Sequence, residues 1–191
     1  MNHNYYAQYD NVRIRPLKCE DIEALRIWRN KKDEARFLRD IGHISSEMQR
    51  KWFDEYQLDD TQIVFAIDEV NELNRIVGSM ALYDIRDTQA EIGKIQIGDK
   101  EAHGRGIGRK SLVMGMKIGF ECLNLNRIVG SVHRDNISAR TNDLRIGFRI
   151  IGQHKSDRDG IEDELEIIRK DVLENNAYYD EIKIGEGGIL I

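Results

Sequence analysis

The sequence feature that most constrains the fold is a glycine-rich stretch at residues 97–120, IGDKEAHGRGIGRKSLVMGMKIGF. Its glycines stand at alternating positions: Gly104, Gly106 and Gly108. The stretch joins a segment of strand character to a segment of helical character. In such a connection the backbone N–H groups of the loop and of the helix N-terminus point at one place, which the helix dipole makes positive. Three cations lie among and after the glycines: Arg105, Arg109 and Lys110. We therefore expect a pyrophosphate cradle that works without a metal ion.

Two familiar phosphate loops need glycine where this chain has Arg109. A Walker A loop fits Lys110 and Ser111 but requires glycine just before the lysine. A dinucleotide fingerprint fits Gly104 and Gly106 but requires its third glycine at the same position. The loop is therefore neither of these, and a plain surface turn before a helix is the remaining alternative to an anion cradle.

Hydrophobic periodicity places the loop within a mixed pattern of strands and helices. Six segments are predicted strands: 12–17, 62–68, 75–85, 90–97, 126–135 and 163–172. Four are predicted helices: 19–30, 44–58, the segment that follows the glycine loop, and 137–148, which Gly147 closes. This order implies a mixed sheet flanked by helices.

The composition favours one soluble domain. The 191 residues include 33% charged and 40% hydrophobic residues, which we interpret as a single domain over residues 1–191, with a core at about 12–170 and a tail at 171–191. No apolar run approaches the ~18 residues that span a bilayer, and the N-terminus does not resemble a signal peptide. The two distant cysteines, Cys19 and Cys122, predict reduced thiols in a cytoplasmic protein. The net charge of −5 argues against general nucleic-acid binding.

Two motifs together resemble the GNAT family of N-acetyltransferases. HGRGIG resembles the family's acetyl-CoA loop, [QR]-x-x-G-x-[GA], although His103 stands where glutamine or arginine is usual. NISARTNDLRIGF, residues 136–148, resembles the family's N-x-x-[SA] helix that ends in G-F. The stretch Trp28-Arg29-Asn30 links the chain to the branch of ribosomal-protein N-terminal acetyltransferases and nucleotide-linked amino-sugar acetyltransferases.

This resemblance implies an α/β (mixed α+β) fold with a central mixed, largely antiparallel twisted sheet flanked by helices. Its fourth and fifth predicted strands, 90–97 and 127–133, would splay apart to admit acetyl-CoA, with no metal. Backbone groups near Ile95 and Ile97 would hold the pantetheine arm and polarise the thioester carbonyl. The amides of Arg105, Gly106, Ile107, Gly108 and Arg109 would bind the pyrophosphate, and His103 and Gly104 belong to the same cofactor-binding set. Asn136, which alone would be read as a turn residue, would bond the pantetheine arm, and Arg140 joins this cofactor-binding set.

The implied chemistry is direct acetyl transfer in a ternary complex. An acceptor amine must lose a proton before attack, and Glu91 is the first candidate for the base, directly or through water. His43 and His103 are alternatives. Asp143 occupies the position of the family's tyrosine acid, and an ionised aspartate is a poor acid. Either burial raises its pKa, or another group or water serves, or the thiolate leaves unaided.

Acceptor contacts are predicted around the connection between the first two helices, including the end of the first: Trp28, Arg29, Asn30, Phe37 and His43. Alternatively, Trp28 packs in the core while Arg29 and Asn30 end the helix. The predicted acceptor is a small-molecule primary amine, with a nucleotide-linked amino sugar favoured over the N-terminus of a ribosomal or other protein. A non-catalytic acyl-CoA-binding module is the alternative of another class. The apolar end of the tail predicts an edge strand, a homodimer contact or a loosely docked terminus.

Overall fold

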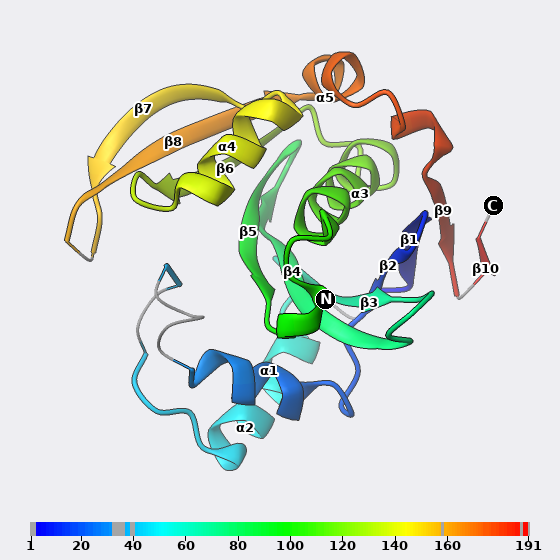
Figure 1. Cartoon of the computed structure of the whole chain (residues 1–191), viewed down its shortest axis with the longest axis vertical. Helices are drawn as coiled ribbons and strands as arrows, with labels where there is room; N and C mark the ends of the chain where they lie inside the picture. The colour runs from blue at the N-terminus through cyan, green and yellow to red at the C-terminus, as the bar shows by residue number, and fades with distance from the viewer. Residues whose placement is uncertain (1–2, 32–36, 39–40, 158, 188, 191) are drawn as a thin grey trace.

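The computed structural model describes residues 3–31, 37–38, 41–157, 159–187 and 189–190, and these form one sheet with helices on both faces (Figure 1). The strand order is β10-β9-β1-β2-β3-β4-β5-β6-β8-β7. The strands are β1 Tyr5–Tyr9, β2 Val12–Pro16, β3 Ile63–Glu69, β4 Arg75–Arg86, β5 Gln89–Ile97, β6 Arg127–His133, β7 Arg149–Lys155, β8 Ile161–Ile168, β9 Lys183–Glu186 and β10 Ile189–Leu190. Neighbouring strands are antiparallel, except that β5 and β6 run parallel. The predicted mixed, largely antiparallel sheet is confirmed.

The helices form two layers. Their bounds are α1 Ile22–Arg29, α2 Ser46–Leu58, α3 Ile107–Glu121, α4 Ile137–Ile146 and α5 Arg169–Asn175, with 3-10 turns at Lys100–Ala102 and Tyr179–Glu181. α3, α4 and α5 cover one face of the sheet, and α1 and α2 cover the other (Figure 1). Within the described part of the chain, no helix is long and apolar enough to cross a membrane.

Strand β3 shows why the sheet is covered on both faces. Its alternate residues Ile63, Phe65 and Ile67 belong to the core cluster that includes α3. Val64 and Ala66 between them belong to the cluster of α1 and α2. From Ile63 to Ile67 the strand is apolar without interruption, as expected of a strand segment buried on both faces.

The structure differs from the sequence prediction at both ends of the sheet. The predicted strand 163–172 is wrong beyond Ile168, because residues 169–175 form α5, where the Asp171 carboxylate accepts a hydrogen bond from the Ile168 N–H at 3.4 Å. The prediction also missed β1 and the exposed edge strand β7. Neither sequence, YYAQY or RIIGQHK, alternates clearly between apolar and polar residues. In the structure only Ala7 of β1 is buried, and β7 is almost wholly exposed, so neither strand needs such an alternation.

The C-terminal tail forms an edge of the sheet. β9 pairs with β1 from Tyr5↔Glu186 to Gln8↔Lys183, and β10 pairs with β9. Of the three alternatives predicted for the tail, this is the edge strand. Because β1 precedes β2, the strands predicted as fourth and fifth are β5 and β6 in the structure.

Candidate functional site

A gap opens between β5 and β6. The two strands pair only from Gln89↔Arg127 to Glu91↔Val129, although β5 runs on to Ile97 and β6 to His133. The predicted splay is therefore confirmed. Beyond Glu91, the backbone groups of β5 that face β6 have no strand partner there, which leaves donors and acceptors for a ligand.

A β-bulge shapes the open half of β5. Ser79 pairs with Gln96 and Ala81 with Gly93, so two residues of β5, Lys94 and Ile95, lie opposite one residue of β4. Lys94 has a φ of 51°, a left-handed conformation that is uncommon for a residue with a Cβ. Bulges bend a strand and redirect its side chains, and this one bends β5 where it leaves β6.

The glycine loop leads to an open helix N-terminus. Gly104 and Gly106 have φ angles of 75° and 72°, in the region that favours glycine. A Cβ built on either would have no heavy atom within 4 Å, so both face open space. Gly106, the N-cap of α3, makes no side-chain capping bond, and the first turn of this 15-residue helix has no acidic residue. Its first N–H groups are therefore available to an external anion.

The loop also contacts the bulged end of β5. His103 Nε2 donates a hydrogen bond to the Ile97 carbonyl at 2.7 Å. A Cβ on Gly108 would lie 3.8 Å from Cγ1 of Ile97 and 3.9 Å from Cδ1 of Ile95. Ile107 is buried in the core, so only its backbone remains for a ligand. The structure thus brings together the loop and strand residues predicted to bind the cofactor.

Two of the loop's three cations are held by nearby carboxylates. Arg105 Nη1 lies 2.5 Å from a Glu72 carboxylate oxygen, and Lys110 Nζ lies 2.6 Å from Asp10 and 2.9 Å from the Asn11 side-chain oxygen. Exposed pairs of this kind are worth little, so an incoming anion can compete for either side chain.

Arg109 has a different position. Its Nη2 lies 3.1 Å from the Asn176 side-chain oxygen and within 3.5 Å of the carbonyls of Arg145 and Asn175, at the C-terminal ends of α4 and α5. A cation is favourable there because helix C-termini carry partial negative charge. The Arg109 side chain therefore joins three helices, and its part in a loop site would come from its backbone N–H.

Helix α4 lies beside β6 and begins with the other cofactor motif. The Asn136 side-chain oxygen caps the helix by accepting from the Ala139 N–H at 3.3 Å. Arg140 Nε and Arg134 Nε reach the two oxygens of Asp163 at 2.7 and 2.9 Å. Burial alone would raise the pKa of Asp163, but the hydrogen bonds from both guanidinium groups hold it below its usual value.

Asp143 is buried on the inner side of α4. Only 9% of its surface is exposed, and it follows Ala139 by four residues and precedes Ile146 by three, so all three share one helix face. Its carboxylate has no hydrogen-bond partner among the described residues. Burial raises its pKa from the ordinary 3.8 to about 7. A carboxyl group at this position is therefore partly protonated near neutral pH.

Glu91 lies on the opposite face of the sheet, where the pairing of β5 with β6 ends. The Tyr83 hydroxyl donates a hydrogen bond to its Oε1. The neighbouring residue, Ile92, points to the other side, since its Cδ1 would lie 3.4 Å from a Cβ on Gly115 of α3. Glu91 and Asp143 thus approach the gap from different faces.

The residues predicted to contact the acceptor divide into two groups. Trp28 is buried, and a Cβ on Gly98 would overlap its ring, while Asn30 bonds both the N–H and the C=O of Ile44 at 2.9 Å. These two side chains hold the local fold. Half-buried Arg29 ends α1 and His43 is exposed. The ring of Phe37 lies 5.6 Å from that of His133 at the end of β6. Residues 32–36 and 39–40 of this segment lie outside the described residues.

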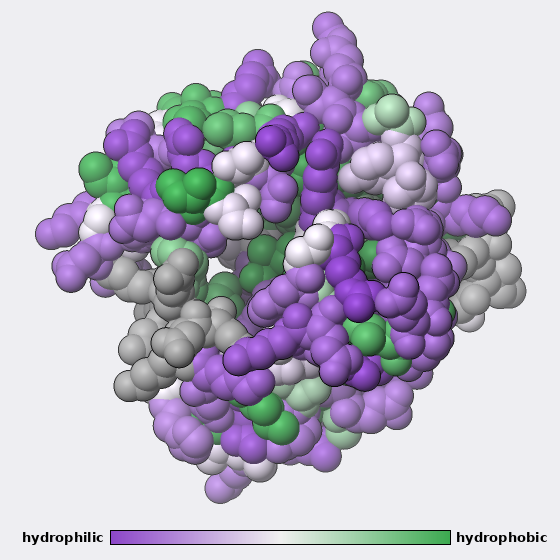
Figure 2. Space-filling view, viewed as in Figure 1, coloured by the Kyte–Doolittle hydropathy of each residue, from purple (hydrophilic) through white to green (hydrophobic). Residues whose placement is uncertain are grey.

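Sequence reasoning missed Tyr83 and a row of glutamates on β8. Strand registers align Glu166 with Val129 and Glu91, Glu164 with Ser131, and Glu162 with His133. Cross-strand partners share a face, so all these side chains lie on the Glu91 side. The sequence signal for this row was the period of two in IEDELEI, residues 161–167, which places Glu162, Glu164 and Glu166 on one face of a strand. Figure 2 shows a hollow with apolar residues in its depth, between the part that carries α4 and the part that carries α1 and α2.

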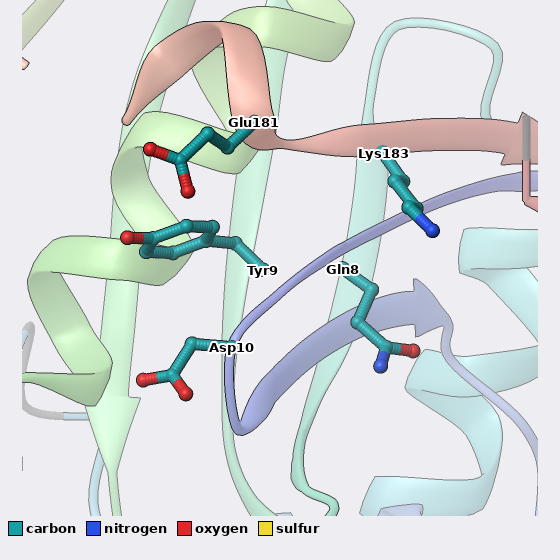
Figure 3. A pocket seen from close by; sticks show the side chains of 5 residues that line it. All are labelled: Gln8, Tyr9, Asp10, Glu181 and Lys183. Atoms are coloured by element: carbon teal, nitrogen blue, oxygen red, sulfur yellow. The ribbon is translucent and has the colours of Figure 1, made fainter. Parts of the chain in front are cut away.

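Two separate surface pockets lie away from the gap. One, of about 240 Å³, is lined by Gln8, Tyr9, Asp10, Glu181 and Lys183 (Figure 3). The other, of about 530 Å³, lies at the β7–β8 hairpin. Neither contains the loop glycines, Glu91 or Asp143. The predicted catalytic residues and the loop glycines therefore lie outside both pockets.

A family model described as acetyltransferase (GNAT) domain matches residues 11–149. Among solved structures, the spermidine N-acetyltransferase of Vibrio cholerae, in complex with CoA and spermine, has a TM-score of 0.77 at 19% identity and covers 85% of this chain and 98% of its own. RimJ of Mycobacterium smegmatis, in complex with CoA-disulfide, has a TM-score of 0.75 at 19% identity and covers 88% and 87%. A GNAT-family acetyltransferase of Bacillus anthracis has a TM-score of 0.74 at 19% identity and covers 86% and 99%. Among curated proteins, no sequence matches the chain.

Proposed function

Since the chain belongs to the GNAT acetyltransferase family, we propose that it transfers the acetyl group of acetyl-CoA to a cationic primary amine at the gap between β5 and β6. Family membership makes it an acetyl-CoA-dependent N-acetyltransferase. The acceptor and the roles of individual residues are our proposals. The observation that carries the acceptor class is the row of glutamates that extends from the gap across β8.

The residues at the gap fit acetyl-CoA. The uncapped N-terminus of α3 suits a pyrophosphate, and the unpaired edge of β5 beyond Glu91 suits an extended arm with amide groups. We assign pyrophosphate binding to the backbone N–H groups of residues 104–109 and pantetheine binding to the backbone near Ile95 and Ile97. Asn136, whose side-chain oxygen caps α4, retains its amide NH₂ for the same arm. We assign Arg140 the positioning of α4 through Asp163.

The two carboxyl groups have complementary tasks in the proposed reaction. Bound acetyl-CoA supplies a thioester whose carbonyl carbon the amine nitrogen attacks, so a C–N bond forms and the C–S bond breaks. Glu91 takes a proton from the acceptor ammonium, directly or through water. Protonated Asp143 gives its proton to the departing sulfur, and the second proton that the nitrogen loses on becoming an amide passes through water to the Asp143 carboxylate left behind. Two titratable groups whose environments set different protonation states are the usual arrangement for such a pair of tasks.

The glutamate row favours a positively charged acceptor. Glu91, Glu162 and Glu164 lie on one face of the sheet. Glu162 lies near Ser156 and His154, and Glu164 lies 3.1 Å from His154 Nδ1. No arginine or lysine of the described residues pairs with Glu164. Carboxylates lining one side of a cleft raise the local concentration of cationic ligands. A nucleotide-linked amino sugar carries phosphate charges that the same carboxylates repel. The Vibrio cholerae structure, which contains spermine, is consistent with a polyamine acceptor.

The test is a comparison of acceptors. We would measure thiol release from acetyl-CoA with spermidine, glucosamine, a nucleotide-linked amino sugar and a peptide with a free N-terminus, and identify each product by mass spectrometry. We expect the highest kcat/KM for spermidine. We expect Glu164→Gln to lower that value several-fold, by raising KM, while Glu174→Gln, at an exposed position on α5, leaves it unchanged.

Other outcomes would contradict the proposed acceptor. A higher kcat/KM for the amino sugars than for spermidine would indicate an amino-sugar acceptor, as the Trp28-Arg29-Asn30 stretch suggests. A higher kcat/KM for the peptide would indicate that the acceptor is a protein N-terminus. Binding of CoA without turnover on any amine would indicate a non-catalytic acyl-CoA-binding module.

A further inference from the structure

Tyr83 and Glu91 form a polar pair on the acceptor face of the sheet. They are direct cross-strand partners between β4 and β5, and the phenolic hydroxyl donates a hydrogen bond to Glu91 Oε1. Both side chains are half-buried. Burial and the neighbouring Glu91 carboxylate raise the pKa of Tyr83. The phenol therefore stays protonated and remains a donor at any physiological pH.

The bulge of β5 holds the tyrosine ring in place. A Cβ on Gly93 would lie 3.1 Å from the Tyr83 hydroxyl oxygen, so the phenol occupies space that only a glycine leaves fully open. The next residue, Lys94, adopts its positive φ at the bulge and places Nζ 4.1 Å from the centre of the Tyr83 ring. An ammonium at that distance is attracted to the ring face. Gly93 and Lys94 thus fix the ring from one strand while Glu91 binds its hydroxyl.

The choice of a phenol as partner has a chemical consequence. An arginine or lysine partner would neutralise the Glu91 carboxylate, whereas a phenol fixes one oxygen and leaves the negative charge in place. The other oxygen, Oε2, has no hydrogen-bond partner among the described residues. Charged groups around the pair come from three strands: Asp84 on β4, Lys94 on β5 and Glu162 on β8. A carboxylate with one oxygen fixed in this way presents its other oxygen, Oε2, in a defined orientation as a proton acceptor.

We propose that Tyr83 is a positioning residue, which holds Glu91 Oε1 so that Oε2 faces the amine of the acceptor. This inference rests on the proposed function, in which Glu91 is the base. Its subject is the orientation of the Glu91 carboxylate, not its identity as the base. A plain structural role for the pair would stabilise the sheet without affecting the protonation behaviour of the reaction.

The experiment compares Tyr83→Phe with Tyr56→Phe. Tyr56 is a buried tyrosine whose hydroxyl accepts a hydrogen bond from the Val64 N–H at 3.1 Å, but it is a residue of α2 and bonds the backbone of β3. For Tyr83→Phe we expect kcat to fall about tenfold, as for loss of one hydrogen bond to a charged group. We expect CoA affinity to be unchanged. The acidic limb of the kcat/KM profile should move to higher pH, since the ionised carboxylate loses a bond that favours it. Tyr56→Phe should leave the profile in place.

Two further variants separate this inference from the proposed function. Glu91→Gln should abolish most turnover, and adding Tyr83→Phe to it should cause no further loss. If Glu91→Gln turns over normally, the proposed base is wrong and the inference fails with it. If Glu91→Gln is inactive but Tyr83→Phe keeps the normal pH profile, the inference alone fails.

Gly93→Ala provides an independent route should Tyr83→Phe fold poorly. Its Cβ would displace the phenol by a few tenths of an ångström, so we expect a reduced kcat with unchanged CoA affinity. Normal kcat in Gly93→Ala, or an equal loss in Tyr56→Phe, would overturn the positioning role.

Discussion

Two helices begin beside the gap between β5 and β6, and their N-termini differ. The N-cap of α3 is Gly106, with no side-chain bond and no acidic residue in the first turn. The N-cap of α4 is Asn136, whose own side chain accepts from the Ala139 N–H. The first helix leaves its N–H groups to a ligand. The second satisfies one of them with its own N-cap and carries a buried carboxyl group, Asp143, about two turns after that N-cap.

The two N-termini suit two different tasks at the site, anion binding and proton donation. An anion is bound by fixed backbone dipoles, which need glycine and an open N-terminus. A proton donor needs a side chain whose pKa is near the working pH, which burial provides. In this chain α3 would serve binding and α4 would serve proton transfer. Variants of the two helices should therefore affect different measurements.

The largest effect is expected on α4. Asp143→Asn keeps the size of the side chain but removes the proton, so kcat at pH 7 should fall roughly a hundredfold, at the low end for a positioned acid. In the unaltered protein kcat should decline as pH rises through about 7, where Asp143 loses its proton. The variant should lack that decline, and its CoA affinity should be unchanged. Turnover measured against pH checks this.

Asp135→Asn is the matched control, because Asp135 is exposed just before α4. Equal turnover and an equal pH profile in Asp143→Asn would show that the sulfur leaves without this acid. The proposed role of α4 in proton transfer would then be wrong, while the role of α3 in binding would be unaffected.

A smaller effect is expected on α3. Gly106→Val puts a branched side chain at a φ of 72°, which distorts the N-cap, and we expect CoA affinity to fall about tenfold, equivalent to about 1.4 kcal/mol. Gly187→Val is the control, since Gly187 also has a positive φ, 62°, and equally open surroundings, in the turn before β10. Calorimetric titration with CoA measures both. Equal affinity in the two variants would contradict the assigned loop.

The same two helices show what the sequence could predict. The open N-terminus of α3 is a local property of consecutive residues, so the pattern of Gly104, Gly106 and Gly108 was sufficient. The splay of β5 and β6 followed from the family resemblance, and both are confirmed. Sequence reasoning left Asp143 between three alternatives, because the burial that raises its pKa depends on how α4 packs.

The acceptor side was harder to predict for the same reason. Tyr83 meets Glu91 through the register of β4 and β5, and Glu162 on β8 reaches the same face although it lies 71 residues after Glu91 in the sequence. Trp28 and Asn30 have the residue types of a binding site, but the structure shows them packed on Gly98 and bonded to Ile44. A homodimer and a cytoplasmic location stay predictions, as does the single domain over residues 1–191.

The smallest predicted effect concerns stability, and it tests the origin of the Asp143 pKa. The native state holds this proton up to about pH 7, whereas an unfolded aspartate releases it near 3.8. Between these values the native state binds more protons than the unfolded state, so the free energy of unfolding falls as pH rises. Across a shift of this size the loss is at most about 4 kcal/mol. Asp143→Asn has no such proton, so the variant should gain on the unaltered protein by about 1–3 kcal/mol between pH 5 and pH 8, an interval that covers only part of the range from 3.8 to about 7. Urea denaturation at both pH values measures the difference, and Asp54→Asn, at an exposed site on α2, should show almost none. A constant difference between the two pH values would mean that Asp143 is ionised in the free protein. A group that raises activity while lowering stability is what a buried catalytic acid should be.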